Sequence, residues 1–224
     1  MPTVTRNLII TNILFFFGTF VASTYGINLN YYLGLHFFLG DGFNLAQLFT
    51  YIFMHGGFAH LFFNMFALWM FGRILETVWG PKKFLIYFLV CGVGAGLVQE
   101  LVQFIEVQTV LSQLGQEGFG GELIKQKVYN SMAYTVGASG SVYGILLAFG
   151  VLFPNQRLFI IPFPFPIKAK YFVVGYAIIE LYAGMGKIPG DTTAHFAHLG
   201  GMVFGLLLLI YWRKNNHGRN PFGS

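Results

Sequence analysis

Residues 7–40 read NLIITNILFFFGTFVASTYGINLNYYLGLHFFLG, and none of them carries a formal charge when histidine is taken as neutral. A run of about 20 apolar residues is long enough to cross the hydrocarbon core of a bilayer as a helix. Residues 7–27 therefore predict a first membrane-spanning helix, and the Gly-, Asn- and Tyr-rich residues 28–42 predict a loop at the membrane interface. The apolar run is too long for a cleaved signal peptide, and no clear small-residue cleavage site follows it.

The composition of the chain points to the same class of protein. Of its 224 residues 55% are hydrophobic and only 9% are charged, against about 25% charged residues in a typical soluble domain. So few charged side chains cannot cover a surface that faces water on all sides. We expect an all-α, polytopic membrane protein with a single domain of six transmembrane helices. One cysteine, Cys91, excludes an internal disulfide.

Five further apolar stretches complete the six predicted spans, at about residues 55–73, 84–105, 137–154, 171–186 and 194–212. Residues 106–132 are the most polar part of the chain, and we expect them to form an extracytoplasmic loop outside the hydrocarbon. Pro162, Pro164 and Pro166 prevent a continuous helix before the fifth span, because proline lacks an N–H group and restricts the residue before it.

The basic residues indicate how the spans are oriented. All but three of the 13 lysine and arginine residues fall on one side of the six-span arrangement, the exceptions being Lys125, Lys127 and Lys187. Cytoplasmic loops are enriched in basic residues, so both termini are predicted to be cytoplasmic. The net charge of +5 is then a consequence of topology and implies no nucleic-acid partner. We expect a multi-pass protein surrounded by lipid, in a bacterial inner membrane.

Several polar side chains lie within the predicted spans, where they are costly unless they face the bundle interior. His60 and Asn64 lie on the second span, Ser139 opens the fourth, and His198 lies on the sixth. At about 1.5 Å of rise per residue, Ser139 and His198 both lie roughly 22 Å above the cytoplasmic boundary, and His60 about 20 Å above it. The three side chains are therefore predicted at similar depth, in the outer third of the membrane.

Glycines follow both the serine and the histidine, as Gly140 and Gly144 on the fourth span and Gly201 and Gly205 on the sixth. Small residues let helix backbones approach closely in lipid, so these two helices are expected to touch and to bring Ser139 against His198. A serine hydroxyl becomes an effective nucleophile when a neighbouring base takes its proton. The pair therefore predicts acyl-transfer chemistry.

An anion formed in that chemistry has candidate hydrogen-bond donors nearby. His60 and Asn64 are four residues apart and project from one face of a helix. The backbone N–H of Ser139 lies at a helix start, where N–H groups and the helix dipole favour negative charge. Removing one donor of this kind typically lowers a rate by about 10²–10³.

These residues together resemble the rhomboid family of intramembrane serine proteases. The resemblance rests on HLFFN at 60–64, GASG at 137–140 with Tyr143, and AHLG at 197–200 with Gly205, in the family's order, and covers roughly residues 47–212. It implies a six-helix core and a Ser139–His198 dyad without an aspartate. It also implies an oxyanion hole made by the Ser139 N–H, His60 and Asn64, supporting roles for Tyr143 and for Gly137, Gly140, Gly201 and Gly205, and no metal or other cofactor.

The resemblance further implies a transmembrane protein substrate, cleaved near its extracytoplasmic end. One departure concerns the first loop, where many family members carry Trp-Arg and this chain has Ala46-Gln47. The usual anchoring of that loop is therefore not expected here. The sequence gives no indication of the oligomeric state.

Other polar residues have less specific interpretations. Glu100 and Glu180 are functional candidates by their predicted location within spans, with interior hydrogen bonding as the favoured role. Ser141 is expected to be structural, and Asp191 could complete a catalytic triad from the last loop, which is not the favoured interpretation.

Two alternative functions stay open beside the protease. His55, His60, His195 and His198 could hold a metal ion, since imidazole suits zinc, copper and iron, although the chain has no HExxH or CxxC motif. A non-catalytic rhomboid-like protein that binds membrane helices is the other alternative, but such proteins generally lack the serine or the histidine. A transporter is disfavoured, because no paired charges are expected across the bundle.

Overall fold

A computed structural model of the chain describes residues 1–116, 118–119, 121–159, 165–186 and 193–215. The helices are α1 (Thr3–Thr24), α2 (Leu29–Leu33), α3 (Gln47–Thr50), η1 (Tyr51–Phe53), α4 (Phe58–Ala67), η2 (Leu68–Gly72), α5 (Arg73–Trp79), α6 (Pro81–Gln116), α7 (Glu122–Ser131), α8 (Ser139–Leu152), α9 (Ala169–Gly186) and α10 (His195–Asn215). Strands β1 (Arg157–Leu158) and β2 (Ile167–Lys168) pair antiparallel between α8 and α9 in the chain.

Four helical stretches among the described residues are long and apolar enough to cross a membrane. They are α1, the continuous stretch Phe58–Trp79 made by α4, η2 and α5, then α6, and α10. Helix α8 is apolar but shorter. These stretches fit the expected class of an all-α membrane protein.

The segment 106–132 differs from the expected loop, because α6 continues to Gln116 and α7 occupies Glu122–Ser131. The physical reason is an apolar stripe within a polar stretch. Val107, Leu111 and Leu114 follow one another at helical spacing and are buried or half-buried, which is the pattern of a helix with one apolar face. The high overall polarity of the segment concealed this stripe in the sequence.

Smaller differences concern the ends of the other predicted spans. The second span, expected at 55–73, runs as helix from Phe58 to Trp79, so His55 precedes it. Gly56 and Gly57 separate that histidine from the helix start, which is consistent with the weak helix propensity of glycine. Of the three prolines before the fifth span, Pro166 precedes β2, while Pro162 and Pro164 lie outside the described residues.

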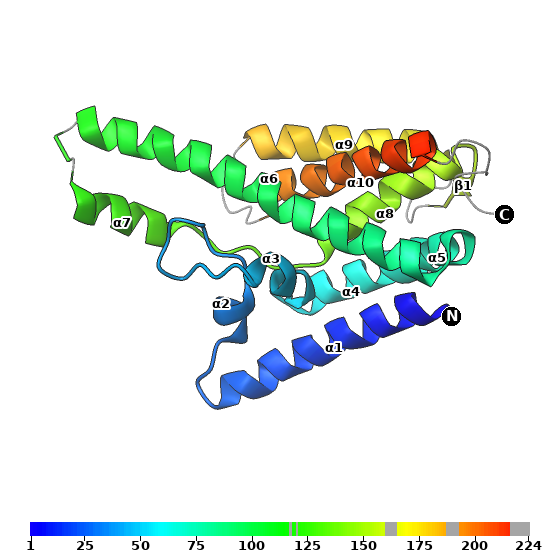
Figure 1. Cartoon of the computed structure of the whole chain (residues 1–224), viewed down its shortest axis with the longest axis horizontal. Helices are drawn as coiled ribbons and strands as arrows, with labels where there is room; N and C mark the ends of the chain where they lie inside the picture. Colours follow the sequence, from blue (N-terminus) through cyan, green and yellow to red (C-terminus); the bar gives the residue numbers. More distant parts are fainter. Residues whose placement is uncertain (117, 120, 160–164, 187–192, 216–224) are drawn as a thin grey trace.

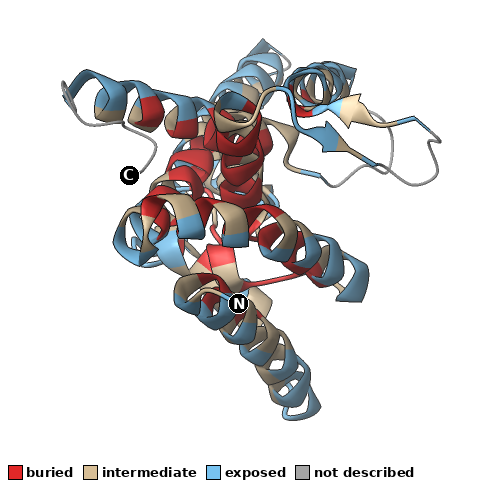
Figure 2. Ribbon diagram, turned by 90° about the vertical axis from the view of Figure 1, so that its right-hand side faces the viewer, coloured by how far each residue is buried: buried red, intermediate tan, exposed pale blue. Residues whose placement is uncertain are grey.

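Helix α6 runs along the molecule, with α8, α9 and α10 to one side of it and α1 and α4 to the other (Figure 1). Buried residues concentrate where α6, α8 and α10 pack together, whereas α1 is largely exposed (Figure 2). The start of α1 and the end of α10 lie at the same end of the molecule. Helix α1 is tied to the body by the buried Glu76, whose carboxylate accepts hydrogen bonds from the Val4 and Thr5 N–H groups and the Thr5 hydroxyl, at 2.7–2.8 Å.

Glycines set the separation of the three central helices. A Cβ at Gly201 would overlap the Gly140 carbonyl oxygen, and a Cβ at Gly144 would lie 3.1 Å from the Gly201 carbonyl oxygen. The backbones of α8 and α10 are therefore in direct contact. Gly205 differs from the expectation, because it faces the Tyr87 hydroxyl on α6 rather than α8.

The loop that precedes α4 is anchored by Gln47, which is only 3% exposed. Its side-chain amide donates to the carbonyls of Tyr32 and Gly42 and accepts from the N–H groups of His36 and Asn44, at 2.9–3.2 Å. Gln47 thus holds the loop through four hydrogen bonds to backbone groups.

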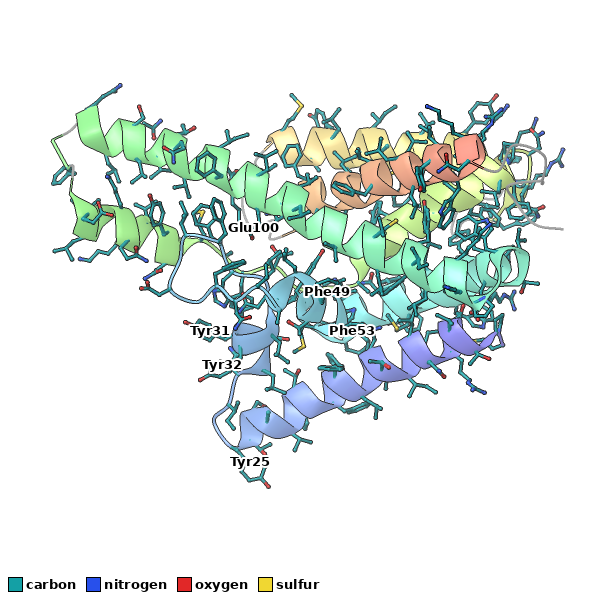
Figure 3. The ribbon with its side chains drawn as sticks, in the orientation of Figure 1. Tyr25, Tyr31, Tyr32, Phe49, Phe53 and Glu100 are labelled. Atoms are coloured by element: carbon teal, nitrogen blue, oxygen red, sulfur yellow. The ribbon has the colours of Figure 1, made fainter. Side chains whose placement is uncertain are left out.

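A second anchor of this loop comes from α6. Glu100 Oε2 accepts the Phe38 N–H at 2.8 Å, and Figure 3 shows Glu100 on the side of α6 that faces the loop. The expectation of interior hydrogen bonding for Glu100 agrees with this contact.

Candidate active site

The site forms where three helices begin. His60 is in the first turn of α4, Ser139 is the first residue of α8, and His198 is in the first turn of α10. The first N–H groups of a helix have no partner within it, and the dipole gives that end partial positive charge. Three helix starts at one place therefore favour a developing negative charge.

Gly137 directs the chain into α8. Its N–H donates to the Tyr51 carbonyl at 2.9 Å, and its φ angle of +132° is one that residues with a Cβ rarely adopt. A Cβ at this position would lie 2.7 Å from His60 Nε2 and 3.6 Å from Ser139 Oγ. Gly137 thus lets the His60 ring lie beside the segment that carries Ser139.

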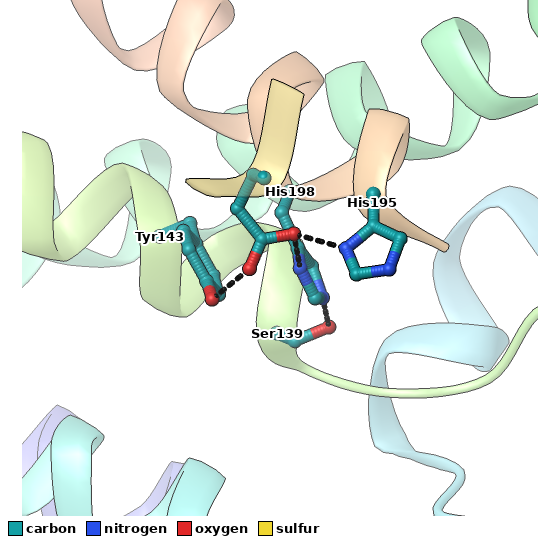
Figure 4. Close-up of polar contacts among 5 residues, drawn as sticks. Ser139, Tyr143, His195 and His198 are labelled. Carbon is teal, nitrogen blue, oxygen red and sulfur yellow. Dashed lines mark hydrogen bonds and ion pairs between the residues drawn. The ribbon is translucent and has the colours of Figure 1, made fainter. Parts of the chain in front are cut away.

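Ser139 and His198 are in hydrogen-bond contact, with Ser139 Oγ 2.8 Å from His198 Nε2 (Figure 4). The distance is normal for a hydroxyl hydrogen bond. His198 is only 8% exposed, whereas Ser139 is half-buried. The contact follows from the close approach of α8 and α10 at Gly140 and Gly201.

Tyr143 packs on the imidazole of His198, with ring centroids 4.2 Å apart and planes inclined by 6°. Tyr143 lies one helical turn after Ser139, so nucleophile and ring project from one face of α8. The stacking restricts the tilt of the His198 ring while its edge faces Ser139.

Glu180 of α9 contacts the ring nitrogen of His198 that does not face Ser139, and it is only 6% exposed. Its Oε2 is 2.9 Å from His198 Nδ1 and 2.7 Å from His195 Nδ1, and its Oε1 accepts the Tyr143 hydroxyl. The sequence indicated interior hydrogen bonding for this glutamate but not its partners. The feature of the sequence that pointed to Glu180 was a carboxylate at membrane depth on the fifth predicted span.

His60 and Asn64 lie on one face of α4, as their spacing predicted. Asn64 is buried, and its Nδ2 donates to the His60 carbonyl at 2.8 Å; the amide carries a second N–H group. The His60 ring also packs edge-to-face on His55, with centroids 5.0 Å apart. The structure therefore places the His60 ring next to Gly137, with Asn64 one turn behind it.

The histidines considered as metal ligands do not gather as a group of four. Among the described residues, the cluster with metal-ligand character consists of Glu180, His195 and His198, whose ligand atoms lie within 4.8 Å of one another. His55 and His60 are not part of it. Asp191, the other candidate acid, lies outside the described residues. Ser141 is fully buried and donates to the Phe88 carbonyl at 2.7 Å, which is a structural role.

Fold and site together define a helical membrane protein with a serine–histidine pair inside the bundle. The Rhomboid domain family matches residues 42–215, and the chain belongs to the rhomboid family. This family contains intramembrane serine proteases and also inactive members.

Three curated relatives illustrate the similarity. Rhomboid protease AarA of Providencia stuartii is 30% identical over 161 residues, which cover 70% of this chain and 52% of that protein. Rhomboid protein 1, mitochondrial, of Saccharomyces cerevisiae is 29% identical over 162 residues, covering 72% and 40%. Rhomboid protease GlpG of Yersinia pseudotuberculosis is 25% identical over 172 residues, covering 76% and 49%. The matches thus span about half the length of these relatives.

Proposed function

We propose that the protein is an intramembrane serine endopeptidase that cleaves transmembrane substrates near their extracytoplasmic end. The observation that carries the proposal is the 2.8 Å contact between Ser139 Oγ and His198 Nε2 within a bundle of apolar helices. The similarity to rhomboid proteases AarA and GlpG supports the same activity. Ser139 is the nucleophile and His198 its general base.

Acylation begins when Ser139 Oγ attacks the carbonyl carbon of the scissile peptide bond and its proton moves to His198 Nε2. A C–O bond forms, and the carbonyl π electrons move to the oxygen. The Ser139 N–H, His60 and Asn64 stabilise this oxyanion, which is the role of an oxyanion hole. The C–N bond then breaks as His198 returns the proton to the leaving amine, which leaves an acyl-enzyme.

Deacylation repeats these steps with water as the nucleophile. His198 takes a proton from the water, the new C–O bond forms, and the tetrahedral intermediate collapses. Ser139 leaves as the alkoxide and regains the proton from His198. The products are the two peptide fragments, and both residues end in their starting protonation states.

The membrane arrangement that we propose has six spans, with α8 and α9 added to the four long apolar stretches. Both termini face the cytoplasm of a bacterium, and the site lies in the outer part of the inner membrane. The distribution of lysine and arginine supports this orientation. The arrangement of the start of α1 and the end of α10 at one end of the molecule agrees with it (Figure 1).

The test is cleavage of a model transmembrane substrate by purified variants in detergent or proteoliposomes. We expect Ser139→Ala and His198→Ala each to abolish cleavage, and a serine-reactive phosphonate to label Ser139 in the wild type. Ser141→Ala is the matched control, because this serine lies two residues away and should be dispensable for cleavage. Undiminished cleavage by folded Ser139→Ala would refute the proposal.

A metal-dependent activity is the second candidate, favoured by the cluster of Glu180, His195 and His198. It predicts cleavage that a chelator abolishes and that survives Ser139→Ala. The serine mechanism predicts the opposite result for both treatments, so one assay separates the two candidates.

A further inference from the structure

The carboxylate of Glu180 links three helices through hydrogen bonds. Tyr143 reaches it from α8 and His195 and His198 reach it from α10, while Glu180 itself belongs to α9. The carboxylate contacts His198 at Nδ1, whereas Ser139 contacts the other ring nitrogen, Nε2; Figure 4 marks these contacts with dashed lines. Burying a carboxylate costs free energy unless its oxygens accept hydrogen bonds, and here three partners supply them.

The hydrogen-bond chemistry of these groups fixes the positions of the protons. An ionised carboxylate only accepts hydrogen bonds, whereas a neutral imidazole has one donor nitrogen and one acceptor nitrogen. Glu180 Oε2 therefore accepts from Nδ1–H of both His195 and His198, and Oε1 accepts from the Tyr143 hydroxyl. With its proton on Nδ1, His198 presents the lone pair of Nε2 to Ser139 Oγ.

We infer that Glu180 is a positioning residue of the active site, which completes a Ser139–His198–Glu180 arrangement. This inference rests on the proposed protease function. Glu180 holds His198 in the tautomer that can take the serine proton, and it stabilises the imidazolium formed when that proton arrives. The proton moves from Ser139 Oγ to His198 Nε2, the Nδ1 proton stays in place, and Glu180 remains a carboxylate throughout.

The imidazole of His198 is thereby held from two directions. Tyr143 stacks on its face and Glu180 binds its edge, so tilt and in-plane rotation are both restricted. Tyr143 links the two restraints because its hydroxyl also binds Glu180. The second histidine, His195, shares Oε2 and keeps the carboxylate aligned with α10.

A metal ion at the same cluster would exclude this role. Coordination by His198 Nδ1 would use the nitrogen lone pair that the proposed tautomer commits to a proton. His198 Nε2 would then carry the remaining ring proton and could not accept one from Ser139. The two interpretations of the cluster therefore differ in whether a chelator changes the reactivity of the serine.

Glu180→Gln is the central variant, because it keeps the shape of the side chain and removes its charge. We expect kcat to fall by about 10⁴-fold, as when the acid of a serine-protease triad becomes an amide, with KM changed less than about twofold. The rate at which a phosphonate labels Ser139 should fall in parallel. Glu180→Asp should retain more activity than Glu180→Gln, since it keeps the charge.

Glu76→Gln is the matched control, because Glu76 is also a buried carboxylate with three hydrogen bonds, but it belongs to α5 and binds the start of α1. It should lower the unfolding temperature and leave kcat per phosphonate-titrated site unchanged. Unchanged kcat and labelling in Glu180→Gln, or equal losses in the Gln and Asp variants, would overturn the positioning role. So would loss of wild-type labelling on adding EDTA.

Activity assays of Ser139→Ala and Glu180→Gln distinguish failure of the protease proposal from failure of the positioning role of Glu180. If Ser139→Ala is inactive and Glu180→Gln fully active, the protease proposal stands and the role of Glu180 fails. If Ser139→Ala still cleaves the substrate, the protease proposal itself fails.

Discussion

At the scale of single residues, His198 links the two sides of the site, because its Nε2 contacts Ser139 and its Nδ1 contacts Glu180. Its depth relative to Ser139 could be predicted, because both distances depend only on helical rise and on the charges that mark the membrane boundary. The partner of its other nitrogen could not be predicted, because it depends on the rotation of α9 about its axis. A carboxylate at membrane depth identified Glu180 as a candidate, and only packing decides which histidines it meets.

A glycine beside the site provides a residue-scale prediction. Gly137→Ala combines a strained φ angle with a Cβ 2.7 Å from His60 Nε2. We expect a loss of about 1–3 kcal/mol of stability from the backbone, together with displacement of His60. Cleavage per folded molecule should fall by about 10²–10³, as on loss of one oxyanion-hole donor.

The control for this prediction is Gly80→Ala, between α5 and α6. Gly80 also has positive φ, +78°, but nothing lies within 4 Å of a Cβ placed there. It should lose stability to a similar extent and retain its specific activity, with both measured by thermal unfolding and substrate cleavage. Equal specific activities of the two variants would show that the position of His60 is not important for catalysis.

At the scale of elements, the contact between α8 and α10 is the one on which the site depends most. Gly201→Ala would place a Cβ against the Gly140 carbonyl oxygen, and overpacking of this kind costs about 1–3 kcal/mol. Separation of the two helices also separates Ser139 from His198, so phosphonate labelling should slow along with the drop in unfolding temperature. Gly175→Ala on α9, where a Cβ meets open space, should lower neither the labelling rate nor the unfolding temperature.

The loop before α4 gives a second prediction at this scale. Gln47→Met keeps the volume of the side chain but leaves four backbone groups without their partner. At about 1 kcal/mol for each hydrogen bond, we expect a loss of about 2–4 kcal/mol and faster proteolysis of residues 34–46. Gln108→Met, at an exposed position on α6, should change stability by less than about 0.5 kcal/mol. Proteolysis at the wild-type rate would argue against this anchor.

Helices could be predicted where apolar runs were long. Helix ends and loop anchors could not be predicted where they depend on tertiary packing. The stretches of all six predicted spans are largely helical in the structure, but α6 extends well beyond the predicted end of the third span. Its last turns are polar overall, and their apolar stripe matters only because neighbouring loop residues and α7 lie beside it. Gln47 likewise has no sequence signature as an anchor, since its role depends on four backbone groups that the loop brings around it.

At the scale of the whole molecule, the orientation in the membrane can be tested by cysteine labelling, because the single native cysteine should not react. Cys91 is fully buried, so a membrane-impermeant maleimide should not label wild-type protein. Lys82→Cys introduces an exposed thiol at the start of α6, on the predicted cytoplasmic side, and Lys125→Cys introduces one on α7, on the predicted outer side. In intact cells with a permeable outer membrane, the reagent should label Lys125→Cys and not Lys82→Cys.

Disrupting the inner membrane supplies the control, because both variants should then react equally. Helix α6 is continuous from Pro81 to Gln116, and Lys125 lies on the polar helix α7 that follows it, so we expect a single crossing to separate the two positions. Labelling of Lys82→Cys alone in intact cells would reverse the proposed orientation. The starts of α8 and α10, and with them Ser139 and His198, would then lie near the cytoplasmic face, and substrates would be cleaved at that end.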